Sequence, residues 1–191
     1  GLVGSEMCIR DSVTTVTVGE ADCDPVIRKA LAIGADDAVR IDAQPQDALH
    51  VASLIANHAK DAGYDVILCG KETIDHNGSV VGGMVAEMLD LAYISLAITL
   101  DLEGGKAHAK REASGGLETV EATMPVVVSA AKGMAEQRIP NMRGIMAART
   151  KPLNVEAPEG GTLGTTVSRF EMPPAKGDCK MVSADQPEEL I

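Results

Sequence analysis

The chain has 191 residues, enough for one domain with a hydrophobic core or for one domain with an appendage. Its formal net charge of −11 at pH 7 argues against a general role on nucleic acid or on anionic membrane surfaces, because such partners attract basic proteins. No apolar run reaches the roughly 20 residues that a spanning helix needs. We therefore expect neither nucleic-acid binding nor membrane insertion.

The cysteines and aromatic residues restrict the possible chemistry. Cys8, Cys23, Cys69 and Cys179 are far apart, form no C-x-x-C pair and have no histidines at metal-ligand spacing, which indicates a reducing compartment and no metal site. With one Phe, two Tyr and no Trp, the chain offers few rings on which a flavin could stack. If a flavin is involved, we expect a second chain to supply much of its site.

Residues 1–12, "GLVGSEMCIRDS", need separate treatment. They lack the basic region and apolar core of a signal peptide. We interpret them as an artefactual leader, the in-frame translation of a sequencing-library adapter, with an ordinary flexible terminus as the alternative. The sequence that informs the fold then starts near Val13.

From Val13 the pattern alternates strands and helices. Strands are predicted at 13–19, 37–42 and 65–70, and the apolar run of 65–70 is typical of a central parallel strand. The first helix has Asp24 as its cap and ends at Gly34, and the second lies within 46–64. This order predicts a parallel sheet covered by helices. The residues expected to face the core are Val26, Ala30, Leu31 and Ile33 in the first helix, and Leu49, Ala52, Ile55, Ala56 and Ala59 in the second.

A polar loop follows the third strand and enters a helix that we expect to begin near Asn77 to Ser79. Such a loop exposes backbone N–H groups at the positive end of a helix, which is typical of a phosphate site. The segment matches neither G-x-x-x-x-G-K-[ST] nor a strict G-x-G-x-x-G. An ordinary strand-to-helix loop, with Asn77 or Ser79 as the helix cap, therefore stays open.

The second half of the chain reads differently. Residues 92–131 alternate with period two, and turns at Gly104-Gly105 and Gly115-Gly116 predict two hairpin connections before an apolar strand that starts at Pro125. A basic, methionine-bearing loop follows at 136–152, and residues 154–191 have the Pro and Gly content of an extended arm. No nucleophile with a partner base is apparent, so we predict no catalytic residue.

Three motifs resemble the beta subunit of electron-transfer flavoproteins: "DVILCGKETIDHNGSVVGGMVAEMLDLAYISLA", "KREASGGLETVEATMPVVVSAA" and "RIPNMRGIMAARTKPL". They occur in that family's order and spacing, and the similarity runs from about Val13 to the end. The resemblance implies a Rossmann-like, adenine nucleotide alpha hydrolase-like parallel sheet with helices on both faces, an antiparallel hairpin region and an extended C-terminal arm. The domain would be residues 13–153 and the arm, contacting an alpha subunit, residues 154–191. The family's first strand and the helix after it are missing, and its closing helix stops at Ile191, so a fragment is expected.

The resemblance implies an electron carrier rather than an enzyme. Such a beta subunit pairs with an alpha subunit that holds most of the FAD contacts, and it binds AMP itself, or a second FAD in electron-bifurcating relatives. The heterodimer accepts electrons from acyl-CoA and related dehydrogenases, as in fatty acid beta-oxidation, and passes them to electron-transfer flavoprotein–quinone oxidoreductase or another acceptor. The location would be the bacterial cytoplasm or, in a eukaryote, the mitochondrial matrix.

The resemblance also assigns residues. Glu112 would contact the mobile flavin domain of the alpha subunit. Met142 would be the apolar anchor of a docking loop, with Ile139 as the alternative anchor and with Arg149 and Lys151 among the surrounding charges. The nucleotide site would be Val18, Gly19, Gly70, Lys71, Asp75, Asn77, Gly78, Ser79, Val80 and Val81, and the docking loop would be Arg138, Ile139, Met142, Arg143, Ile145 and Met146.

Three alternatives stay open. Ile145 and Met146 could merely pack a short helix onto the domain. The chain could also be a stand-alone nucleotide-binding protein resembling universal stress proteins, or an adenylating enzyme of the same superfold. The basic loop and the arm favour the electron carrier over the stand-alone protein. An adenylating enzyme would need a phosphate-binding glycine loop after an early strand, and that region is absent from this sequence.

Overall fold

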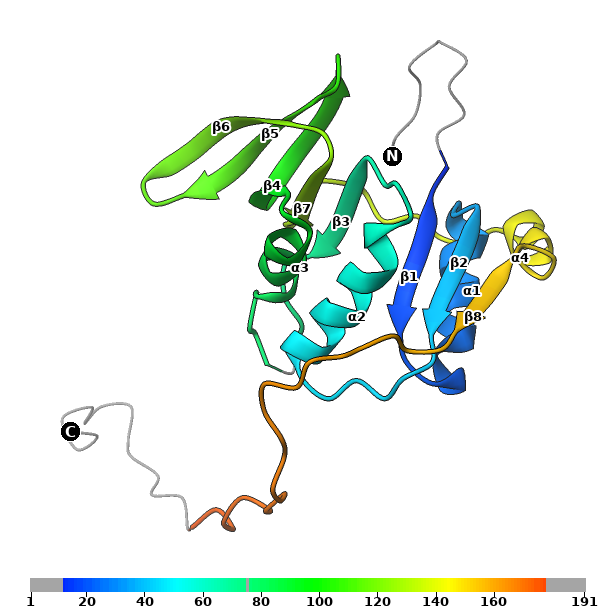
Figure 1. Cartoon of the computed structure of the whole chain (residues 1–191), viewed down its shortest axis with the longest axis vertical. Coiled ribbons are helices and arrows are strands. Elements are labelled where there is room, and N and C mark those ends of the chain that lie inside the picture. The colour runs from blue at the N-terminus through cyan, green and yellow to red at the C-terminus, as the bar shows by residue number, and fades with distance from the viewer. Residues whose placement is uncertain (1–11, 75, 178–191) are drawn as a thin grey trace, which may run out of the picture.

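The computed structural model describes residues 12–74 and 76–177, which form an α/β protein with a projecting hairpin region and a long irregular arm (Figure 1). Residues 1–11 of the proposed leader and residues 178–191 of the arm lie outside the described residues. The elements in chain order are β1 (Thr14–Val18), a 3-10 turn η1 (Ala21–Cys23), α1 (Asp24–Ile33), β2 (Asp37–Ile41), α2 (Ala48–Lys60), β3 (Val66–Gly70), α3 (Val81–Leu89), β4 (Ala92–Glu103), β5 (Lys106–Ala113), β6 (Gly116–Thr123), β7 (Val126–Ala130), α4 (Met142–Ala148) and β8 (Leu153–Glu156).

The strands form two hydrogen-bonded sheets. The first has the order β1-β2-β8 and is parallel throughout, with Val39 paired to Val16 on one side and to Asn154 on the other. The second has the order β3-β7-β4-β5-β6, in which β3, β7 and β4 are parallel and β4, β5 and β6 are antiparallel. The predicted α/β class and the antiparallel hairpin region are confirmed. Because β8 takes residues 153–156 into the first sheet, the irregular part of the arm begins at Ala157.

Helices cover both faces of the first sheet. Ala38 of β2 packs in one cluster with Ile27 and Leu31 of α1 and with Ala148 of α4. Because side chains alternate along a strand, Val39 and Ile41 point to the opposite face of the sheet, where they pack against Leu54 of α2. The small three-stranded sheet is therefore enclosed between α1 with α4 on one side and α2 on the other.

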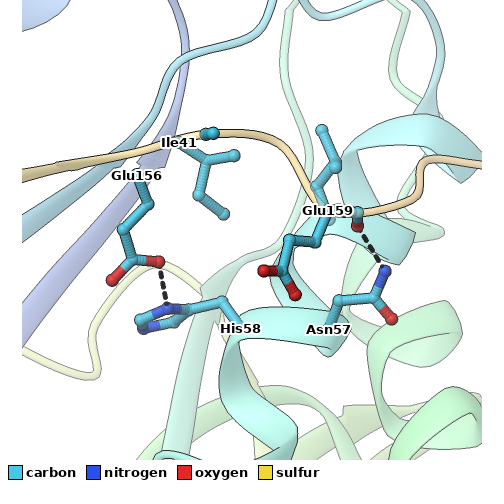
Figure 2. A pocket seen from close by; sticks show the side chains of 7 residues that line it. Ile41, Asn57, His58, Glu156 and Glu159 are labelled. Carbon is cyan, nitrogen blue, oxygen red and sulfur yellow. Dashed lines mark hydrogen bonds and ion pairs between the residues drawn. The ribbon is translucent and has the colours of Figure 1, made fainter.

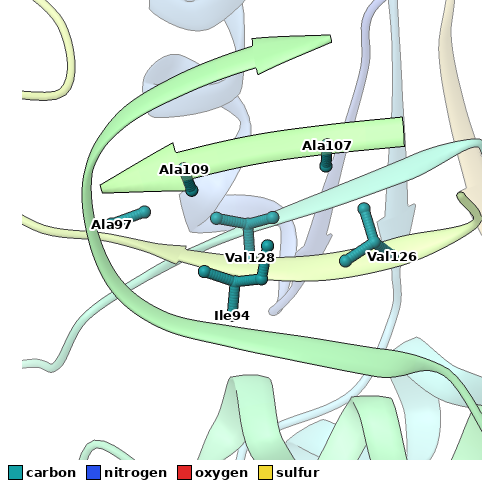
Figure 3. Packing of buried hydrophobic residues seen from close by; sticks show 6 residues of the cluster. All are labelled: Ile94, Ala97, Ala107, Ala109, Val126 and Val128. Atoms are coloured by element: carbon teal, nitrogen blue, oxygen red, sulfur yellow. The ribbon is translucent and has the colours of Figure 1, made fainter. Parts of the chain in front are cut away.

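The second sheet is covered by a helix on one face and by its own hairpin region on the other. Val127 of β7 packs against Val85 and Ala86 of α3. β4 bends at Leu96, which has a left-handed φ of 56° and donates its N–H to Ser129 Oγ at 3.0 Å. The bend lets β4 and β5 curl over β7, so that one compact cluster forms (Figure 3). Its buried members are Ile94, Ala97, Ala107, Ala109, Val126 and Val128.

The predicted inner face of α1 is only partly right. Leu31 is buried as predicted, but Val26 is 66% exposed and Ile33 is 40% exposed. Ile27, which was not predicted, is buried one helical turn before Leu31. Asp24 is the first helical residue rather than the cap, which is Cys23. The side chain of Asp24 instead pairs with Arg40, Oδ1 to Nε at 2.9 Å, so a tertiary contact replaces the expected local one.

The face of α2 is predicted more closely. Asp47 caps the helix, because its Oδ1 accepts a hydrogen bond from His50 N at 2.7 Å, and Ala52, Ala56 and Ala59 are buried as expected. Leu49 and Ile55 are only half-buried, while Ser53 and Leu54 are buried. The reason is that α2 contacts both β1 and α3, so its buried surface is wider than one stripe.

β3 is not a central strand in the described structure. It pairs with β7 on one edge, and within residues 12–74 and 76–177 no strand pairs with its other edge. The side chain of Leu68 in this strand is 50% exposed. β1 likewise pairs only with β2 in this part of the chain. The apolar run of β3 predicts a strand paired on both edges, but in the described residues only one of its edges is paired.

Candidate nucleotide-binding and docking sites

The loop between β3 and α3 runs from Gly70, the last residue of β3, to Val81, the first residue of α3. The helix begins slightly later than predicted. Its cap residue is Val80, which makes no side-chain cap hydrogen bond, so the prediction of Asn77 or Ser79 as the cap is wrong. The first turn of α3 therefore has no capping oxygen of its own for its free N–H groups.

The polar residues of this loop contact one another. Asn77 and Ser79 both have left-handed φ angles, 48° and 52°, and Asn77 N donates to Thr73 O at 2.8 Å. Ser79 Oγ donates to Glu72 Oε2 at 2.9 Å, and Lys71 Nζ lies 3.0 Å from Glu72 Oε1. The hydrogen bonds from Lys71 and then Ser79 hold the pKa of Glu72 below its ordinary value.

Glu72 was missed by the sequence reasoning, although it lies inside the predicted loop. Its carboxylate shows that Ser79 and Lys71 together present donors to an oxyanion. Gly78 lies between the two left-handed residues and is exposed, and Asp75 lies outside the described residues. A loop that already holds one carboxylate has the donor chemistry for a phosphate, provided that Glu72 gives way.

The turn after β1 is held by a buried arginine. Val18 ends β1, and the next residue, Gly19, is buried. Gly19 N donates a hydrogen bond to Ile41 O at 3.1 Å, and Gly19 O accepts one from Arg40 Nη1 at 3.0 Å. The Arg40 side chain also pairs with Asp42 at 2.6 Å, and this hydrogen bond raises the pKa of Arg40. Among the described residues no hydrogen bond joins this turn to the 70–81 loop, although β1 and β3 point the same way in Figure 1.

Arg40 was also missed, and a sequence signal existed for it. A lone arginine between Val39 and Ile41 in a buried strand must find partners or remain outside the core. Here it fixes the turn at Gly19, where an added Cβ would lie 2.5 Å from Cys23 Sγ. Both predicted parts of the nucleotide site, the turn at Val18 and Gly19 and the loop from Gly70 to Val81, are thus held in place by specific hydrogen bonds.

A cavity of about 240 Å³ lies elsewhere, between the end of β2, α2 and the start of the arm (Figure 2). His58 Nδ1 is 2.9 Å from Glu156 Oε2, and His58 Nε2 is 3.0 Å from the hydroxyl of Tyr64, whose pKa is raised by burial. None of the predicted site residues lines this cavity. Its lining is Ile41, Leu54, Asn57, His58, Glu156, Ala157 and Glu159.

The arm is fastened along α2 by polar contacts. Asn57 Nδ2 donates to Glu159 O at 2.7 Å, and Ser53 Oγ accepts from Thr162 N at 3.0 Å. Nearer the helix start, Asp47 Oδ2 accepts from the N–H groups of Gly164 and Thr165 at 2.8 and 2.6 Å. One carboxylate thus caps α2 and holds the arm.

The predicted docking loop contains the short helix α4. Asn141 caps it, with Oδ1 accepting from Gly144 N at 2.8 Å. The face toward α1 carries Gly144 and the buried Ala148. The outer face carries Met142, 74% exposed, with Ile145 and Met146 one turn further on and also exposed.

The contact of α4 with α1 is made by Gly144 and by the buried Ala148, whereas Met146 is 57% exposed and Ile145 is 40% exposed. Ile139, 85% exposed, precedes the helix.

The charges around the loop are only partly as expected. Arg138, Arg143 and Arg149 are exposed. Lys151 is not a free surface charge, since its Nζ donates to Leu31 O at 3.0 Å and also to Ala35 O. On β5, Glu112 is exposed beside the ion pair of Arg111 and Glu118, at 2.8 Å.

No helix in the described part of the chain has the length and hydropathy to cross a membrane, and no three His, Cys, Asp or Glu side chains gather there at metal-binding distances. A parallel α/β core with a strand-to-helix loop after β3 and a short helix with an exposed apolar face is compatible with the Rossmann-like class of α/β domains. The chain belongs to the electron transfer flavoprotein domain family, whose model matches residues 6–159. The resemblance predicted from the three motifs is thereby confirmed.

Three similar curated proteins share one name. Electron transfer flavoprotein subunit beta of Bacillus subtilis (strain 168) is 32% identical over 195 residues, which cover 94% of this chain and 76% of the relative. The protein of that name from Syntrophomonas wolfei subsp. wolfei is also 32% identical, with 96% and 73% covered. The human protein of that name is 36% identical over 161 residues, which cover 82% of this chain and 62% of the relative.

Proposed function

We propose that this chain is the beta subunit of a heterodimeric electron-transfer flavoprotein, an electron carrier with no catalysis of its own. It would work in the bacterial cytoplasm or the mitochondrial matrix. Electrons would come from acyl-CoA or related dehydrogenases and pass to electron-transfer flavoprotein–quinone oxidoreductase or another acceptor. The family membership and the relatives' shared name support the role. The structural observation that carries it is the exposed apolar face of α4.

An alpha subunit would hold most of the FAD, which supplies the one-electron chemistry when bound. The scarcity of aromatic residues in this chain supports that division. The arm carries exposed apolar side chains with no cover in the described structure, among them Phe170 and Met172, and these suit an extended segment that wraps a partner. Glu112, exposed on β5, would meet the flavin-carrying domain of the alpha subunit.

AMP would bind on the loop from Gly70 to Val81, with Val18 and Gly19 on its other side, in an adenine nucleotide alpha hydrolase-like arrangement. The residues fit the phosphate of such a ligand, because the first turn of α3 has no capping side chain and Ser79 already donates to an oxyanion. Binding would require Glu72 to leave Ser79. A second FAD is the alternative occupant.

The docking surface would be Met142, Ile145 and Met146 on α4 with Ile139 beside it, surrounded by Arg138 and Arg143. A small apolar anchor with charged neighbours suits weak and rapid association with several dehydrogenases. Thioether side chains also adapt to differently shaped pockets. The chain's own task in electron transfer is thus to hold the flavin-bearing partner near each donor.

Met142→Ala tests this role in the purified heterodimer with an acyl-CoA dehydrogenase as donor. We expect the rate of donor-dependent flavin reduction at low heterodimer concentration to fall by about 5- to 30-fold, because a central hot-spot side chain contributes roughly 1–2 kcal/mol. Heterodimer yield, FAD content and nucleotide content should not change. Met88→Ala, a partly exposed methionine on α3, is the matched control. Normal rates in the double variant of Ile139 and Met142 would reject the docking role.

A further inference from the structure

The docking helix is too short to be stable alone. α4 has 7 residues, fewer than an isolated helix needs in water, so its geometry depends on what it packs against. Its neighbour is α1, which it meets in the cluster around Leu31 and Ala148. The orientation of the exposed face is therefore decided at this helix pair.

The carbonyl groups at the carboxyl end of each helix accept hydrogen bonds from a basic side chain of the other segment. Arg28 of α1 donates from Nη1 to Ala148 O at 2.8 Å and to Lys151 O at 2.7 Å, at the end of α4. In return Lys151 Nζ donates to Leu31 O at 3.0 Å and to Ala35 O, at the end of α1. Each helix thus receives a cation where its last carbonyls lack intrahelical partners and where the helix dipole is negative.

A second contact fixes the rotation of α4 about its own axis. A Cβ built on Gly144 would overlap the carbonyl oxygen of Ala32, so the two backbones touch at this point. With Gly144 against α1, the side chains of Met142 and Met146 point outward from the opposite face, and Ile145 lies at the flank, where it is 40% exposed. We call the reciprocal hydrogen bonds of Arg28 and Lys151 the clamp. Together with the contact at Gly144, the clamp leaves α4 little freedom to rotate about its axis or to fray at its end.

We propose that Arg28, Lys151 and Gly144 are positioning residues for dehydrogenase docking, which set the direction in which α4 presents its apolar face. The inference rests on the proposed docking role of Met142. Arg28, whose side chain is half-buried, acts through the carbonyl groups of Ala148, the last residue of α4, and of Lys151 just beyond it. Without the clamp, α4 would spend only a fraction of its time in the docking-competent orientation. The apparent dissociation constant rises by the inverse of that fraction, whereas electron transfer within the docked complex is unaffected.

The test uses the holo-heterodimer as the substrate of an acyl-CoA dehydrogenase. Arg28→Met removes the donors and keeps an apolar stem, and we expect KM for the heterodimer to rise roughly tenfold with kcat unchanged, as for a competent fraction of about one tenth. Arg28→Lys, which keeps a cation with three donors, should restore most of the loss. Lys29→Met, on the exposed neighbouring residue, is the control and should leave both constants unchanged.

Amide hydrogen exchange in residues 142–148 supplies a second measurement that needs no donor enzyme. Exchange there should accelerate in Arg28→Met and in Lys151→Met, with FAD content unchanged. Faster exchange without a change in KM would show a clamp that only stabilises the fold, and would overturn the proposal. Unchanged exchange, or a fall in kcat at constant KM, would overturn it as well. If Met142→Ala raises KM and Arg28→Met does not, only this inference fails. If Met142→Ala has no effect, the docking role itself fails.

Discussion

Replacing Leu31 by Ala is expected to lower the free energy of unfolding by about 3 kcal/mol. Leu31 is 1% exposed and lies where α1, β2 and α4 meet. The substitution removes three buried carbon atoms and leaves a cavity behind them. The same side chain supports α4, so the change bears on the docking helix as well as on the core.

The magnitude follows from the neighbours. Buried Leu→Ala changes cost roughly 2.7–5 kcal/mol, depending on how far the surroundings collapse into the space. Ala35, Ala38 and Ala148 have short side chains that cannot reach into the cavity. Leu153, a longer side chain packed against the same cluster, can relax into part of the space, which places the expected cost toward the lower end of the range.

Urea unfolding followed by circular dichroism measures the effect. With a denaturant slope of about 2 kcal/mol per molar, the midpoint should fall by about 1.5 M. Val26→Ala on the same helix is the control, and because Val26 is 66% exposed its effect should stay within about 0.5 kcal/mol. A larger loss for Val26→Ala than for Leu31→Ala would show that Val26 rather than Leu31 is buried in the core, and would refute the packing described above.

Two further predictions concern the arm and the nucleotide. Hydrogen bonds, first of all from His50 N, lower the pKa of Asp47 to about 2, so its hold on the arm should be complete above pH 4 and should weaken as the pH falls through 2. Asp47→Ala should therefore speed tryptic cleavage after Arg169 at neutral pH, and cleavage at the wild-type rate would argue against the contact. Ser79→Glu should abolish bound AMP in the heterodimer, because its charge opposes the phosphate at the start of α3. The nucleotide is released by denaturation and identified by chromatography, with Ser79→Ala as the control variant. An AMP content in Ser79→Glu equal to that of the wild type would show that AMP binds elsewhere. Finding FAD in this site of the wild-type heterodimer would reject AMP as the ligand.

The sequence by itself determined the local features of this protein. The order of strands and helices, the turn at Gly104 and Gly105, where both φ angles are positive, and the end of α1 at Gly34 all depend on residues close together in the chain. The motif around the 70–81 loop and the basic loop at 136–152 likewise identify the family from contiguous residues. Such signals survive because backbone conformation is set mainly by neighbours in sequence.

Only the tertiary structure decided how those pieces work together. Periodicity allows several neighbouring stripes on α1, and the choice of Ile27 and Leu31 over Val26 follows from where α4 and β2 lie. The roles of Arg28 and Lys151 depend on hydrogen bonds that join residues more than 100 positions apart. The sequence of the basic loop does not show whether Lys151 is a free surface charge or binds another helix, because the carbonyl groups that accept its hydrogen bonds lie at the end of α1. Long-range contacts of this kind reflect the whole chain's packing, and no local pattern encodes them.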